Sequence, residues 1–191
     1  MKAKNLYNQN LQQHLDVVNA SKDLDAIIYQ SILLLTESIT KGGKIIFCGN
    51  GGSAADSQHL ASEFTGRFIK DREPIASLAL TTDSSALTCI SNDYSYEQVF
   101  ARQLKAIGKE GDVFVGISTS GNSNNIIEAI KVAKDIGIKT ISLLGNDGGA
   151  MKDLGDLSIT IPSDVTARIQ EMHILVGHTL CGGVEQELGL V

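Results

Sequence analysis

The sequence predicts one α/β domain, a three-layer sandwich in which a five-stranded parallel sheet is flanked by helices. Five short apolar runs are rich in β-branched residues and lack alternation, which is typical of strands buried on both faces of a parallel sheet. Helical patterns lie between these runs, and such an order favours right-handed crossover connections. The chain has 191 residues, 42% of them hydrophobic, enough for one core but short for two domains. We therefore expect residues 1–191 to form a single domain.

The elements follow in order along the chain. Two helices are expected over residues 5–40, because leucine and isoleucine recur there with helical spacing before Gly42 and Gly43 end the second helix. The expected strands cover 44–48, 75–80, 112–117, 139–144 and 157–161. The remaining helices are expected at 54–66, 84–91, 95–108, 123–136 and 166–188. Ligands of such folds bind at the carboxyl ends of the strands, so the loops there are where site residues are sought.

Composition and charge exclude several classes of function. Sixteen Lys and Arg against 22 Asp and Glu give a net charge of −6 without a basic stripe, which argues against nucleic acid as a partner. Cys48, Cys89 and Cys181 are too few and too scattered for a disulfide framework, so we expect small buried apolar side chains. No signal-peptide core and no membrane-spanning apolar run is present, which favours a cytoplasmic protein without a membrane partner.

The first expected strand is followed by a glycine-rich loop, Gly49-Asn50-Gly51-Gly52-Ser53-Ala54, that opens a helix. Glycines let the backbone approach a ligand, and the helix N-terminus offers free N–H groups to an anion. The loop also matches the G-x-G-x-x-A dinucleotide fingerprint. The acidic residues with suitable spacing, Asp71 and Glu73, precede the second strand instead of ending it, which disfavours that alternative.

The third strand ends in Ser118-Thr119-Ser120-Gly121-Asn122-Ser123, again at the start of a helix. Four hydroxyls and a helix N-terminus can hold a phosphate monoester without Lys or Arg. The alternative is an ordinary N-cap with solvated hydroxyls, but four hydroxyls exceed what a cap requires. No P-loop motif is present. The fourth strand ends in residues 145–149, which we interpret as a structural turn.

Two helices carry groups able to do chemistry. His59 and Glu63 are four residues apart and share one helix face. The last helix is largely apolar, so its polar residues need partners or a role. Gln170 and His178 are about 12 Å apart along that helix, so one metal ion could contact both only from a position between them. We expect His173 to be a hydrogen-bonded structural histidine and His14 to lie at the surface.

Four segments in the same order resemble the sugar isomerase (SIS) domain family, and within it the bacterial phosphoheptose isomerases. They are CGNGGSAADSQHLASEFTGR from Cys48, SND at 91–93, GDVFVGISTSGNS from Gly111 and ARIQEMHILVGH at 167–178. The resemblance spans essentially the whole chain. It implies a parallel sheet preceded by N-terminal helices (1–41) that help to build a homotetramer with active sites at subunit interfaces.

The resemblance also implies an activity and its residues. The reaction is the aldose–ketose isomerisation of sedoheptulose 7-phosphate to D-glycero-D-manno-heptose 7-phosphate through an enediol(ate), the first step of ADP-heptose synthesis for lipopolysaccharide or capsule. Glu63 and His178 are the implied acid and base. One zinc ion is implied on His59, Glu63, Gln170 and His178. The implied substrate contacts are Asn50, Gly51, Gly52, Glu63, Asn92, Asp93, Ser118, Thr119, Ser120, Ser123 and Gln170.

One residue departs from the pattern of many isomerases in the family. Ala167 stands where they carry an acidic residue, and alanine occurs there in a non-catalytic relative that binds the replication initiator. Glu63 and His178, which that relative lacks, favour an enzyme. The alternatives are a non-catalytic SIS protein, either such an adaptor or a sugar-phosphate-binding regulator, and an isomerase or aldolase-like enzyme for another sugar phosphate.

Overall fold

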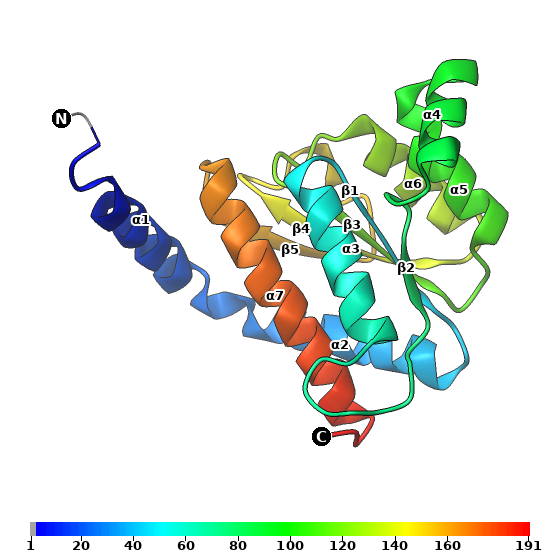
Figure 1. Cartoon of the computed structure of the whole chain (residues 1–191), viewed down its shortest axis with the longest axis horizontal. Helices are drawn as coiled ribbons and strands as arrows, with labels where there is room; N and C mark the ends of the chain where they lie inside the picture. Colours follow the sequence, from blue (N-terminus) through cyan, green and yellow to red (C-terminus); the bar gives the residue numbers. More distant parts are fainter. Residues whose placement is uncertain (1–2) are drawn as a thin grey trace.

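The computed structural model describes residues 3–191 and confirms the expected α/β sandwich (Figure 1). Five parallel strands form one sheet in the order β2-β1-β3-β4-β5. The strands are β1 (Ile45–Gly49), β2 (Ser77–Ala79), β3 (Val113–Ser118), β4 (Lys139–Gly145) and β5 (Leu157–Ile161). Strand β2 is shorter than expected because the N–H of Ile75 donates to the Phe64 carbonyl of a helix instead of joining the sheet.

The helices agree with the expected pattern apart from one division. The 95–108 segment begins with a 3₁₀ turn, η2 (Tyr96–Gln98), which continues into α5 (Val99–Ile107). Two more 3₁₀ turns are η1 (Lys22–Leu24) and η3 (Gly149–Met151). The other helices are α1 (Leu6–Ala20), α2 (Asp25–Thr40), α3 (Gly52–Thr65), α4 (Ser84–Asp93), α6 (Asn124–Asp135) and α7 (Thr166–Glu187).

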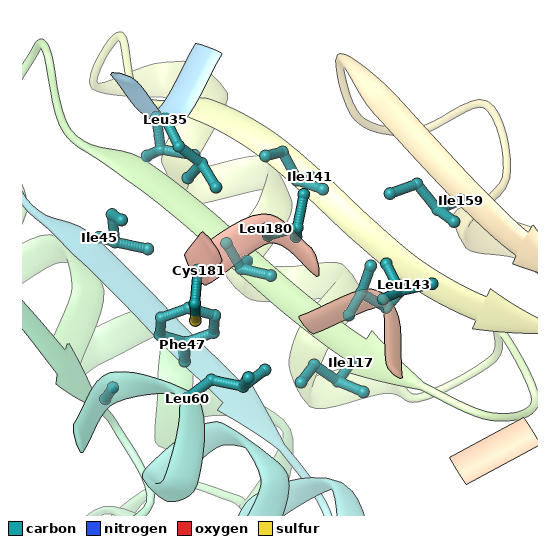
Figure 2. Close-up of a cluster of buried hydrophobic side chains, with 14 of the residues drawn as sticks. Leu35, Ile45, Phe47, Leu60, Ile117, Ile141, Leu143, Ile159, Leu180 and Cys181 are labelled. Carbon is teal, nitrogen blue, oxygen red and sulfur yellow. The ribbon is translucent and has the colours of Figure 1, made fainter. Parts of the chain in front are cut away.

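Successive residues of β1 serve two different cores, as the pleat of a strand requires. Ile45 and Phe47 face the core formed with α2, α3 and α7, whereas Ile46 and Cys48 face the core formed with α5 and α6. Figure 2 shows the first core, where Leu180 of α7 lies among the side chains of the strands. No helix within residues 3–191 is long and apolar enough to cross a membrane.

The strand order determines where the loops after neighbouring strands run to opposite faces of the sheet. The chain leaves β1 for β2 on one side and returns to β3 on the other, so a switch point lies between β1 and β3. Helix α3, which follows β1, packs on one face of the sheet, and α6, which follows β3, packs on the other. A crevice at the carboxyl ends of β1 and β3 is the usual ligand position of such a sheet. The loop that begins at the end of β1 (49–54, the glycine loop) and the loop that begins at the end of β3 (118–123, the serine loop) meet there.

Candidate active site

The serine loop after β3 folds its hydroxyls toward one another. Ser118 is buried, and its Oγ lies 2.8 Å from Ser123 Oγ and 3.5 Å from Ser120 Oγ. Ser118 Oγ also accepts the N–H of Gly121 at 3.1 Å. The Ser123 side chain makes no capping hydrogen bond to α6, although Ser123 is its N-cap residue. The cap alternative therefore does not account for this hydroxyl, which faces the loop.

The neighbouring loop at 145–149 supports the serine loop. Asn146, Gly148 and Gly149 have left-handed φ values of 55°, 91° and 52°, which confirms the expected structural turn. Gly121 also has a positive φ, 66°, and a Cβ there would overlap the Gly148 carbonyl oxygen. The Asn146 side chain donates to the Thr119 carbonyl at 3.0 Å. The close approach of these two loops thus requires glycine at position 121.

Asn50 connects the glycine loop to the first turn of α6, directly after the serine loop. Its amide and that of Asn125 exchange two hydrogen bonds, at 3.0 and 2.8 Å, and Tyr96 Oη donates to Asn50 Oδ1 at 2.9 Å. Asn125 is buried in the first turn of α6. Neither Asn125 nor Tyr96 was expected from the sequence. The position of Asn125, two residues after the serine loop ends, was the one local signal that could have indicated it.

Gly51 and Gly52 begin α3 beside the last helix. Gly51 has a φ of 57°, and a Cβ on Gly52 would collide with the Gln170 side-chain amide. Glycine at 52 therefore makes room for Gln170. Asp71 and Glu73, the acidic residues with dinucleotide-site spacing, lie exposed between the far end of α3 and the start of β2. They are therefore not at the end of the second strand, where a dinucleotide site needs its acidic residue.

His59, Glu63 and His178 converge on the outer side of α3 and α7. His59 Nε2 lies 2.9 Å from His178 Nε2 and 3.4 Å from Glu63 Oε1. One donor atom from each residue lies within 4.8 Å of the others. Two facing imidazole nitrogens and a carboxylate oxygen form a donor set that suits zinc. The residues present therefore fit a metal ion.

Gln170 lies away from these three residues in the same chain. Helices α3 and α7 start at the same edge of the sheet and lie side by side (Figure 1), with Gly52 beside Gln170 and Leu60 beside Gly177. Gln170 therefore lies near the start of α3, about 12 Å along α7 from His178. Its place among the metal ligands stays a prediction.

Asn92 and Asp93 lie exposed at the end of α4. The Asn92 amide donates to Asp93 Oδ1 at 2.8 Å, and Cys89 Sγ donates to Asp93 Oδ2 at 3.5 Å. Their contact with a sugar stays a prediction. The expectation for the cysteines is wrong in one case, because Cys89 is exposed while Cys48 and Cys181 are buried. The hydrogen bond and charge of Asp93 raise the pKa of the Cys89 thiol.

The two other histidines have structural partners. His173 is buried, with Nε2 at 2.9 Å from the Leu144 carbonyl oxygen, so the expected structural role is confirmed. Burial lowers the pKa of His173 to about 4. His14 is partly exposed, in line with the expected surface position, and its Nδ1 lies 2.8 Å from Glu171 Oε2, which places α1 against α7. The sequence did not indicate this pair because the two residues are far apart along the chain.

Asp56 is a further polar group that the sequence reasoning missed. Its spacing places it on the same face of α3 as His59 and Glu63. Within residues 3–191, the buried Oδ2 of Asp56 has no hydrogen-bond partner. Burial raises the pKa of Asp56, although the nearby His59 opposes this. The helical spacing 56, 59, 63 was the available signal.

Comparison with known proteins shows which family shares this sequence and fold. A family model described as the SIS domain matches residues 6–145. The phosphoheptose isomerase of Helicobacter pylori (strain P12) is 54% identical over 165 residues, 86% of this chain and 86% of the relative. Phosphoheptose isomerase 1 of Campylobacter jejuni is 52% identical over 182 residues, 95% of this chain and 98% of the relative.

A solved structure agrees with the sequence relatives. The phosphoheptose isomerase of Neisseria gonorrhoeae matches with a TM-score of 0.90 and 42% identity, over 96% of this chain and 98% of that one. The fold, the share of the chain covered and the sequence identity all indicate the same group of proteins, the phosphoheptose isomerases. The chain therefore belongs to the SIS domain family and is a sugar-phosphate isomerase of its phosphoheptose isomerase group.

Proposed function

We propose that this enzyme converts sedoheptulose 7-phosphate to D-glycero-D-manno-heptose 7-phosphate in the cytoplasm, and so supplies ADP-heptose synthesis for lipopolysaccharide or capsule. The observation that carries the proposal is the convergence of His59, Glu63 and His178 on one face of the α3–α7 pair. The printed names of the relatives, at about half identity over nearly the whole chain, support the phosphoheptose class.

The serine loop binds the phosphate in this proposal. Ser118 Oγ lies within hydrogen-bonding distance of both Ser120 Oγ and Ser123 Oγ, so an entering phosphate replaces these contacts with bonds to its oxygens. The N-terminus of α6 adds a favourable dipole for the anion. Thr119 supplies the fourth expected hydroxyl. The amide pair of Asn50 and Asn125 holds the glycine loop beside this phosphate.

Glu63 and His178 carry the proton transfers. The ketose carbonyl lies at C2, so isomerisation removes a proton from C1, forms a cis-enediol(ate) and returns the proton to C2. Glu63 takes and returns the carbon proton, while His178 moves the proton between O1 and O2. Each such group contributes roughly 10²–10⁴-fold in rate.

A zinc ion is proposed on His59, Glu63 and His178, with Gln170 as the fourth expected ligand. When bound, zinc polarises the carbonyl and stabilises negative charge on the substrate oxygens. His59 has no other proposed role. Its half-exposed ring faces His178 at 2.9 Å, a position suited to holding the ion at the edge of the site.

A homotetramer with active sites between subunits is also proposed. Helix α1 projects from the body of the molecule (Figure 1), and its Leu6, Leu11 and Leu15 are exposed. A hollow of about 390 Å³ that includes Leu175 reaches His178. Glu63 lies about 16 Å along α3 from Gly52, so a small sugar does not span the site of one chain. A neighbouring copy would complete it.

Turnover of sedoheptulose 7-phosphate tests the proposal directly. The purified protein is incubated with this ketose and zinc, and heptose 7-phosphate is measured. Glu63→Gln should abolish the activity, whereas Glu128→Gln, which alters an exposed pair with Lys131 on α6, should not. Faster turnover of a six-carbon ketose phosphate would reassign the substrate.

A catalytically inactive protein would overturn the proposal. Absence of turnover with every sugar phosphate in the presence of zinc, together with capture of the replication initiator, would favour the adaptor alternative. Binding of a sugar phosphate without turnover would favour the regulator instead. Size-exclusion chromatography with light scattering tests the tetramer, and a monomer at micromolar concentration would contradict it.

A further inference from the structure

A buried ion pair, Arg72–Glu185, holds the segment that follows α3. Residues 66–76 pass around the C-terminal end of α7 on their way to β2 (Figure 1). The Glu185 carboxylate in α7 is fully buried and accepts the N–H groups of Phe68 and Ile69, each at 3.1 Å. Arg72 Nε donates to the same carboxylate at 2.7 Å. Three donors therefore satisfy one buried charge.

The rest of the Arg72 guanidinium binds the end of α3. Nη2 donates to the carbonyl of Glu63 at 2.8 Å, and Nη1 donates to the carbonyl of Phe64 at 2.7 Å and to that of Gly66 at 3.2 Å. Carbonyl groups in the last turn of a helix have no partner within the helix. Arg72 supplies donors for these carbonyl groups, and one of the carbonyls belongs to Glu63 itself.

The same carboxylate also sets the position of Phe68. The Phe68 ring packs against the His178 ring, with centroids 5.4 Å apart and planes 30° apart. A Cβ on Gly182 would lie 3.2 Å from this ring, so the ring rests on α7 next to His178. Glu185 binds the Phe68 backbone, and Phe68 limits the movement of the imidazole.

We propose that the Arg72–Glu185 pair is a positioning device that holds Glu63 and His178 in the arrangement used for metal binding and proton transfer. The inference rests on the proposed roles of those two residues. Stability alone does not explain the pair, because replacing a buried ion pair with apolar groups is often neutral or stabilising. Positioning does explain it, since a displacement of about 1 Å can cost roughly 100-fold in rate.

Arg72→Lys tests the proposal without removing the charge. A single ammonium group cannot contact Glu185 and all three carbonyls in the planar pattern of a guanidinium. We expect kcat to fall about 10-fold or more and the zinc affinity of the protein to fall about 10- to 100-fold, as when supporting groups of metal ligands are changed. KM should change little, because no hydrogen bond of Arg72 or Glu185 reaches the serine loop that is proposed to hold the phosphate.

Asp112→Asn is the matched control. Asp112 is also a buried carboxylate with three donors: Lys44 Nζ at 2.5 Å and the N–H groups of Lys44 and Lys109 at 3.0 and 2.9 Å. It joins the amino ends of β1 and β3 and contacts none of the proposed catalytic residues. This variant should lower the thermal midpoint but leave kcat and zinc affinity unchanged.

Zinc affinity is measured by competition with a chromophoric chelator, and stability by thermal unfolding. A lower thermal midpoint of Arg72→Lys with unchanged zinc affinity and kcat would overturn the proposal. If Arg72→Lys does not fold, Phe68→Leu tests the contact with His178 while leaving the ion pair intact. That variant should lower zinc affinity and kcat, and unchanged values would again overturn the proposal. Zinc affinity separates this result from failure of the proposed substrate, which would affect turnover alone.

Discussion

The buried His173 should make the free energy of unfolding decrease as the pH falls from neutral toward 4. His173 is 1% exposed, and its Nε2 lies 2.9 Å from the Leu144 carbonyl, so the neutral ring donates there. Its Nδ1 is buried without a partner in the part of the chain that the structure describes. A second proton on Nδ1 would therefore be a buried and uncompensated charge, which explains why burial lowers the pKa to about 4.

The sign and size of the effect follow from the two pKa values. The unfolded chain protonates His173 near pH 6.5, whereas the folded protein protonates it only near pH 4. Stability from the neutral ring is fully present above pH 6.5 and is lost as the pH falls toward 4. Between pH 7.5 and pH 5 the loss is about 2 kcal/mol.

Denaturant unfolding of the wild type and of His173→Gln measures this effect. The Gln side chain can still donate to the Leu144 carbonyl but does not titrate. A chelator and a fixed protein concentration remove the contributions of metal binding and assembly. The stability advantage of the wild type over the variant should shrink by about 2 kcal/mol from pH 7.5 to pH 5. An advantage independent of pH would refute the reasoning.

Four further results are expected. Ser123→Ala should raise KM for the sugar phosphate about 10- to 100-fold, because a hydrogen bond to a charged group is lost; an unchanged KM would contradict the phosphate assignment. Gly121→Ala should lower the free energy of unfolding by more than about 1 kcal/mol through its positive φ and the overlap with Gly148. Measured in urea, this loss should exceed that of Gly189→Ala, which shares a positive φ of 68° but whose Cβ meets nothing within 4 Å. Leu60→Ala should cost about 2–5 kcal/mol of stability as a cavity in the main core, and a cost below 1 kcal/mol would contradict tight packing there. Zinc at about 100 times its Kd should stabilise the chelator-treated protein by about 2.7 kcal/mol, and His59→Ala should weaken this stabilisation.

The strands and helices could be predicted because their signals are local. The apolar runs at β1 and β3 indicate strands buried on both faces, and the observed alternation between Phe47 and Cys48 follows from the pleat. The serine loop was also predictable, since its hydroxyls lie within six residues of one another. The division of the 95–108 segment and the short β2 were not, because they depend on partners such as the Phe64 carbonyl elsewhere in the fold.

The elements, their order and the loops at the ends of β1 and β3 can be read from the amino-acid sequence, because each depends on residues close along the chain. Two pairings across elements, Asn50 with Asn125 and Arg72 with Glu185, emerge only in the folded molecule. The family resemblance implied that His59 and His178 share one ion, and the fold brings their Nε2 atoms to 2.9 Å. Periodicity shows which face of a helix turns inward, but not which residue of another element lies opposite. That choice arises when the helices pack at a particular height and rotation on the sheet, and it is there that the candidate site takes its shape.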